Sequence, residues 1–99
     1  MTFVAHTALG HVAVVEGHYD EAASHYAKAV LASPRFSIAY FCQAIALALA
    51  GRVEEARPIV QQLLQLNPSF RSSQVFDYAV VGPFATKVKE GARLLGLPE

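Results

Sequence analysis

Two stretches of the chain carry apolar residues at the spacing of an amphipathic α-helix. In both, apolar side chains recur at positions i, i+4, i+7 and i+8, which lie on one face of a helix. The two stripes are Ala22, Tyr26, Ala29 and Val30, and Ala56, Val60, Leu63 and Leu64. Each stretch ends just before a proline, Pro34 or Pro68, because the residue before a proline is disfavoured in the helical conformation.

Each amphipathic stretch follows a segment that is apolar on more than one side. These segments are Phe3–Glu16 and Ile38–Ala50, and each is followed by a glycine, Gly17 or Gly51. Glycine adopts the left-handed conformation that commonly ends a helix. Asp20 is predicted to cap the second helix, because its carboxylate can accept the free N–H groups at a helix start. The pattern therefore predicts two units of helix, turn and helix.

The two units align when the sequence is shifted by 34 residues. The shift pairs Gly17 with Gly51, Glu21 with Glu55, Ala22 with Ala56, and Pro34 with Pro68. A repeat period of this length indicates a stack of similar helical units that share a continuous core.

The sequence after Pro68 begins a third unit and then departs from it. The run Val80-Val81-Gly82-Pro83 interrupts the first helix of that unit, and a last helix is predicted before Gly96. Terminal repeats commonly differ from the others because they cap the stack. We therefore predict a single all-α domain with helices near 3–16, 20–32, 37–50, 54–66, 70–80 and 84–95. Its parts are repeat one (3–36), repeat two (37–70), and a degenerate third repeat with a capping helix (71–99).

The order of small and large residues resembles the 34-residue motif of the tetratricopeptide repeat (TPR) family. That motif has a small residue midway along its first helix, here Gly10 and Ala44, and another early in its second helix, here Ala22 and Ala56. The chain departs from the motif at His6, Tyr40, Gln43, Leu63 and Tyr78. The resemblance implies a TPR-like α-solenoid of antiparallel helix pairs that serves as a protein–protein interaction scaffold.

The tail, VGPFATKVKEGARLLGLPE, carries a second resemblance. It is similar to the C-terminal end of TPR segments attached to some bacterial class III adenylate/guanylate cyclase-like proteins. This resemblance implies a fragment of a larger bacterial signalling protein. The alternative function is then that of a regulatory C-terminal part of a nucleotide cyclase whose catalytic domain is absent from these 99 residues.

In a TPR stack the first helix of each unit lines a concave groove, and the resemblance assigns ten residues of this chain to it. They are Val4, Thr7, His11, Val14, Val15, Ile38, Phe41, Cys42, Ile45 and Leu49. None is a lysine, arginine or asparagine, the side chains that would hold the C-terminal carboxylate of a peptide. An apolar groove suits an amphipathic helix of a partner protein. The alternative occupant is the last helix of the chain itself.

Composition supports an interaction surface and argues against other partners. Hydrophobic residues make up 54% of the chain and charged residues 16%, with eight basic and eight acidic side chains. A domain this small cannot bury so much apolar surface, so part of it is expected at a contact with another protein. The balanced charge argues against nucleic acid. The uncharged segment 36–51 is shorter than the roughly 20 residues that a membrane helix needs, so we expect no membrane partner.

The sequence offers no arrangement for catalysis or metal binding. The four histidines, His6, His11, His18 and His25, include no i, i+4 pair on one helix. Cys42 has no neighbouring cation to activate its thiol, and Glu54-Glu55 suits the start of a helix. We predict no enzyme activity, catalytic residue, metal or cofactor. The single cysteine and the lack of a recognisable signal peptide favour a cytoplasmic location.

The number of repeats predicts self-association. Two regular repeats are fewer than the three or more that a stable stack commonly needs. The first helix, Phe3–Glu16, would normally pack against a preceding repeat, and it has apolar residues on several sides. We therefore expect the isolated chain to form a two-fold symmetric homodimer. The contact is predicted at the first helix or at the groove around Phe41 and Ile45.

Overall fold

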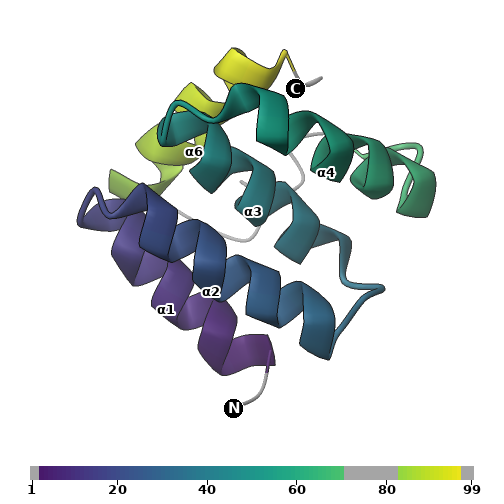
Figure 1. Cartoon of the computed structure of the whole chain (residues 1–99), viewed down its shortest axis with the longest axis horizontal. Coiled ribbons are helices and arrows are strands. Elements are labelled where there is room, and N and C mark those ends of the chain that lie inside the picture. The colour runs from purple at the N-terminus through teal and green to yellow at the C-terminus, as the bar shows by residue number, and fades with distance from the viewer. Residues whose placement is uncertain (1–2, 71–82, 97–99) are drawn as a thin grey trace.

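A computed structural model of the chain describes residues 3–70 and 83–96 (Figure 1). These residues form five α-helices and no strand. The helices are α1 (Phe3–Val15), α2 (Tyr19–Ala32), α3 (Ser37–Leu49), α4 (Val53–Leu66) and α6 (Pro83–Leu95). Each bound lies within one residue of its prediction, and the all-α class is confirmed. The helix predicted at 70–80 falls almost wholly on residues 71–82, which lie outside the described residues.

The first four helices form two helical hairpins that stack side by side. Each helix packs against the next one in the chain, so α2 lies between α1 and α3 (Figure 1). Helix α6 crosses this array on one side, where it packs mainly on α3 and also contacts α1 and α4. The arrangement follows from the sequence: each hairpin is too narrow to bury its apolar residues alone, so the second hairpin covers the first.

The turns inside the two hairpins have the same geometry. The N–H of Gly17 donates to the carbonyl of Val14 at 3.1 Å, and that of His18 donates to the carbonyl of Ala13 at 2.8 Å. The turn at Gly51 repeats both hydrogen bonds, at 3.0 and 2.8 Å. Both glycines have φ of +81°, the left-handed conformation of a Schellman helix end. The prediction that these two glycines end helices is therefore confirmed.

Small residues set the close approach of the helices. A methyl group at Gly10 in α1 would lie only 2.5 Å from Cε1 of Tyr26 in α2. The side chains of Ala22 and Ala56 are completely buried at equivalent positions of the two hairpins. These are the positions at which the TPR motif has small residues, so the packing agrees with the predicted register.

The predicted capping role of Asp20 is wrong. Helix α2 begins at Tyr19, which places Asp20 in the first turn, and the residue at the cap position is His18. No side-chain hydrogen bond caps this helix start. The carboxylate of Asp20 instead binds Arg52 of the second hairpin. The aspartate that a capping rule assigns to the helix start thus forms a salt bridge with a residue outside the helix.

Candidate partner-binding site

The predicted groove residues of α3 lie mostly in the core. Phe41, Cys42 and Ile45 are buried, and Ile38 and Leu49 are partly buried against the same core. The ring of Phe41 lies 5.0 Å from that of Phe70, measured between centroids. These side chains therefore belong to the interior of the domain rather than to an open groove.

Helix α6 reaches α3 closely because it has a glycine at the contact. A methyl group at Gly91 would lie 2.7 Å from Cγ2 of Ile45 and 3.2 Å from its carbonyl oxygen. Val88 and Ala92 of α6 are also buried beside this position. The last helix thus occupies the part of the groove next to Ile45, which is the arrangement that the sequence offered as the alternative to a partner helix.

Cys42 is an internal packing residue with a protected thiol. Burial raises the pKa of the thiol to about 12. A hydrogen bond with the Tyr26 hydroxyl lowers this pKa, but by less than burial raises it. The Tyr26 side chain is itself completely buried, and burial raises its pKa as well. The thiol therefore stays protonated near neutral pH and has the character of a small apolar side chain.

The predicted groove residues of α1 are more accessible, and three of them meet in one depression. It has a volume of about 300 Å³ and is lined by Val4, Thr7, Ala8, His11 and Phe36. Phe36 comes from the segment just before α3, so the two hairpins both contribute to this depression. Val14 is buried on the inner side of α1, whereas Val15 is exposed and does not line the depression. The sequence reasoning missed Ala8 and Phe36.

His11 is the titratable side chain at the edge of this depression. Its Nδ1 lies 2.6 Å from the hydroxyl oxygen of Tyr26, and its ring centroid lies 4.3 Å from that of Phe84 in α6. Burial lowers the pKa of His11, which favours the neutral ring. Contacts with Tyr26 and Phe84 thus hold a neutral imidazole at the junction of α1, α2 and α6.

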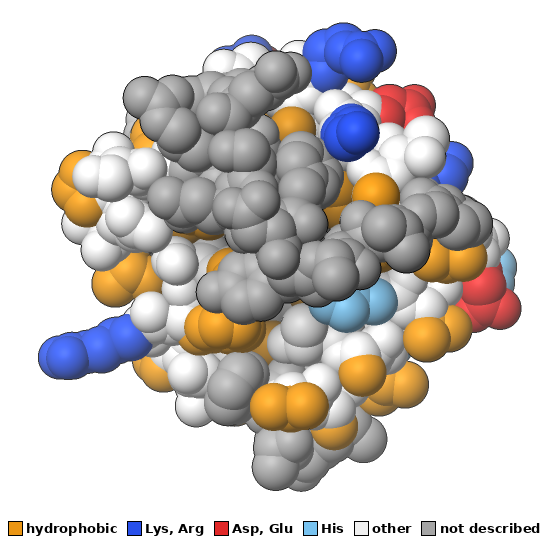
Figure 2. Space-filling view, turned by 180° about the vertical axis from the view of Figure 1, so that it is seen from behind, with side chains coloured by type: hydrophobic (Ala, Val, Ile, Leu, Met, Phe, Trp, Pro, Cys, Tyr) orange, Lys and Arg blue, Asp and Glu red, His pale blue; other side chains and the backbone are white. Residues whose placement is uncertain are grey.

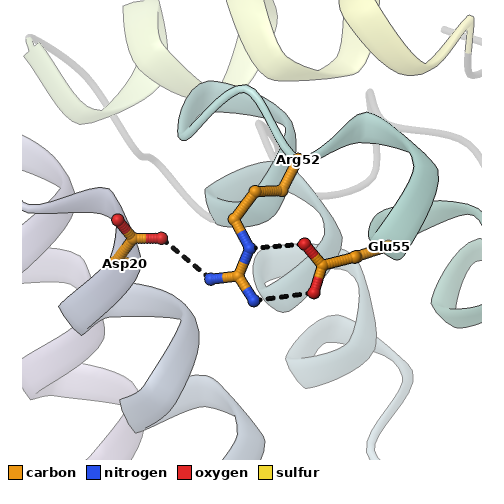
Figure 3. Close-up of polar contacts among 3 residues, drawn as sticks. All are labelled: Asp20, Arg52 and Glu55. Carbon is orange, nitrogen blue, oxygen red and sulfur yellow. Dashed lines mark hydrogen bonds and ion pairs between the residues drawn. The ribbon is translucent and has the colours of Figure 1, made fainter.

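A second depression, of about 340 Å³, lies between α2 and α4 and has a charged rim. Its lining includes Asp20, Gln43, Leu47, Arg52 and Glu55. Figure 3 shows the guanidinium of Arg52 between the two carboxylates. It donates to Oδ1 of Asp20 at 2.8 Å and to both oxygens of Glu55 at 2.7 and 2.8 Å. These bonds raise the pKa of Arg52 and lower that of Glu55.

This charged cluster joins the two hairpins and was missed by the sequence reasoning. The sequence pattern assigns Glu55 to the start of a helix, although Glu55 also lies three residues after Arg52, a spacing that allows an ion pair. Arg52 donates to both carboxylates, so its own charge is paired within the cluster, while one guanidinium and two carboxylates leave one excess negative charge there. The ion pairs at the rim of this depression therefore connect the two hairpins.

The remaining histidines and acidic residues that the structure describes do not form a metal site. Glu21 lies 3.6 Å from His18 and 3.7 Å from His25. Across the part of the chain that the structure describes, no three His, Cys, Asp or Glu side chains come together in a set able to hold a metal ion. Among the helices at 3–66 and 83–95, none is long and apolar enough to cross a membrane.

The outer side of α1 is an apolar surface that none of the other described helices covers. Val4, Leu9, Val12 and Val15 are all exposed there. Figure 2 views the molecule from behind, so that α1 lies at the lower right, and hydrophobic side chains gather along that edge. Exposed apolar surface of this extent is typical of a contact with another protein.

Stacked antiparallel helix pairs with a period of 34 residues define a helical-repeat protein, a class that uses its surfaces to bind other proteins. The family model described as Tetratricopeptide repeat matches residues 7–69, more than half of the chain. The chain belongs to the tetratricopeptide repeat family. Repeats of this family are generally protein-interaction modules without catalysis of their own. No curated protein and no solved structure matches the chain.

Proposed function

We propose that the chain binds a segment of another protein in the apolar depression beside α1. The observation that carries this proposal is the accessible site lined by Val4, Thr7, Ala8, His11 and Phe36. It contains three of the ten residues that the TPR resemblance assigns to the groove. Its lining is almost entirely apolar, so it favours an apolar side chain over a charged one.

The size and chemistry of the depression limit what the partner presents. A volume of about 300 Å³ accommodates one or two large apolar side chains rather than a whole helix. An amphipathic helix of the partner would lie along α1 and insert a leucine or phenylalanine between Val4 and Phe36. Among the described residues that line the site there is no lysine or arginine, so the proposed ligand is an internal segment rather than a C-terminal carboxylate.

The buried residues of the predicted groove have a supporting role in this proposal. Val14, Phe41, Cys42 and Ile45 are buried in the core that joins the helices, and Ile38 and Leu49 are partly buried against the same core. Val15 extends the exposed apolar surface beyond the depression.

The wider context is also part of the proposal. The division into repeat one (3–36), repeat two (37–70) and a capping region (71–99) fits a binding module within a larger, cytoplasmic bacterial signalling protein. The alternative is the regulatory C-terminal part of an adenylate/guanylate cyclase, and it rests on the resemblance of the tail. Sequencing of the gene on both sides of this segment distinguishes the two, since only the second requires a cyclase catalytic domain.

The binding proposal is tested with the isolated chain as bait. Proteins from a bacterial extract that the chain retains are compared with those retained by Val4→Asp. Val4 is 62% exposed, so this change places a charge in the depression at little cost to folding. The control is Leu31→Asp, which introduces the same charge at a leucine of α2 that is 82% exposed. Equal retention by Val4→Asp and the parent chain would contradict the proposal.

A further inference from the structure

The outer face of α1, which we define as Ala5, Ala8, Leu9, Val12 and Val15, has no covering helix among the described residues. Val12 is 55% exposed, Val15 45% and Leu9 40%. Between Phe3 and Val15 the helix has no lysine, arginine, aspartate or glutamate. A helix that is apolar on all sides is normally buried on all sides. The exposure of this face therefore indicates a missing neighbour.

The second repeat shows how the same face is used when it is covered. The 34-residue shift relates Ala5, Ala8 and Val12 of α1 to Ala39, Cys42 and Ala46 of α3. Those three α3 residues are buried, and α2 packs along α3 with Tyr26 hydrogen bonded to Cys42. The repeat geometry thus provides for a helix along this face, and the neighbour that α1 lacks is a helix.

The spacing of the face fits a copy of itself. Ala5, Ala8, Val12 and Val15 are separated by three, four and three residues, the alternation found along the seam of two packed helices. When two copies of α1 lie antiparallel with residue 10 of each at the centre, Ala8 meets Val12 and Ala5 meets Val15. A small residue then faces a larger one at each level, so the two helices can pack closely along their whole contact.

The charges at the ends of α1 favour the antiparallel direction. The first turn of α1 has no acidic residue and its last turn has no basic residue, so neither end is matched to the helix dipole. Exposed Glu16 directly follows the helix. In an antiparallel pair, each Glu16 lies beside the N-terminal end of the other helix, where a negative charge is favourable. A parallel pair would place the two Glu16 side chains next to each other.

We propose that the outer face of α1 binds the same face of a second copy of the chain, with the two α1 helices antiparallel about a two-fold axis. The sequence left two locations for a homodimer contact, and burial of Phe41 and Ile45 favours the one at α1. A contact formed by one short helix from each copy is at the small end of specific interfaces. The dimer is therefore weak and depends on protein concentration.

The first experiment measures the molar mass of the full chain by sedimentation across a concentration series. The parent chain should change from monomer to dimer, and Val12→Glu should raise the dissociation constant by about tenfold or more, because it buries an unpaired charge at the contact. Leu31→Glu is the control, since this exposed leucine lies on α2, and it should dimerise like the parent. Circular dichroism checks that each variant is folded. A parent chain that stays monomeric, or a Val12→Glu chain that still dimerises normally, would overturn the proposal.

A charge-pair experiment tests the antiparallel register. Ala8→Lys and Val12→Glu are each expected to be monomeric, but an equal mixture should form a heterodimer in which the new lysine faces the new glutamate. Failure of the mixture to associate would overturn the antiparallel arrangement. Val12 does not line the depression beside α1, so capture of a partner by Val12→Glu tests the proposed function separately from the dimer.

Discussion

The ring of Tyr26 lies directly against the backbone of Gly10, and no side chain fits between them. Tyr26 is completely buried and also contacts His11 and Cys42, so it has little freedom to move aside. Gly10 and Tyr26 together fix how closely α1 approaches α2. In the second repeat the 34-residue shift pairs Gly10 with Ala44 and Tyr26 with Val60, so a larger residue on the first helix accompanies a smaller residue on the second.

Gly10→Ala should therefore destabilise the domain. We expect a loss of about 1–3 kcal/mol in the free energy of unfolding, as for other overpacked cores, measured by urea denaturation. Because alanine normally favours a helix over glycine, an increase in stability would contradict the contact. The double variant Gly10→Ala/Tyr26→Val copies the pair found in the second repeat. It should show a favourable coupling of about 0.5 kcal/mol or more in a double-mutant cycle.

Ala22→Leu and Ala56→Leu should each overpack the interior of one hairpin. Both alanines are fully buried, and three extra carbon atoms at either position should cost about 1–3 kcal/mol of stability. Thermal melts of the two variants provide the measurement. Lys28→Leu, at an exposed position of α2, is the control and should melt close to the parent. Unchanged melting temperatures for both alanine variants would show that the repeat register is wrong.

Arg52→Met should weaken the joint between the hairpins in a salt-dependent way. The guanidinium bonds Asp20 of the first hairpin and Glu55 of the second, but all three groups face solvent, so the effect on stability is small. The loss should be larger at low ionic strength, because salt screens exposed ion pairs. Arg57→Met is the comparison, since within residues 3–70 and 83–96 Arg57 pairs with Glu54 of its own helix and not with the other hairpin. Equal salt dependence of the two variants would contradict a linking role for Arg52.

The stability of the domain should fall in mild acid through His11. Burial lowers the pKa of His11 in the folded chain, while the unfolded chain binds a proton near the ordinary pKa of about 6.5. The unfolded state therefore takes up the proton first, and stability is present above about pH 6.5 and declines as the pH falls below it. The pKa of His6 is lowered in the same direction. Urea denaturation at several pH values measures the decline, and His11→Gln should reduce it. A His11 that NMR finds titrating at or above its ordinary pKa would contradict this prediction.

The sequence predicted the described helices well because each of their ends has a local cause. Gly17 and Gly51 end helices through their own backbone freedom, and Pro34 and Pro68 act on the residue directly before them. Asp20 was misassigned because its partner Arg52 lies 32 residues away, and a capping rule considers only nearby atoms. The groove posed the same difficulty, since whether Ile45 is covered depends on Gly91 of α6. Phe36 was missed at the depression because it precedes a helix rather than lying within one.

The chain contains one cysteine, and its thiol is enclosed between the two hairpins. Cys42 lies on α3 and hydrogen bonds Tyr26 on α2, so a thiol reagent reaches it only when these helices separate. The rate at which Cys42 reacts, compared with its rate in the denatured chain, therefore reports how often the joint between the repeats opens. Cys42 is thus a built-in chemical probe of how often α2 and α3 separate, at the contact where the two hairpins meet.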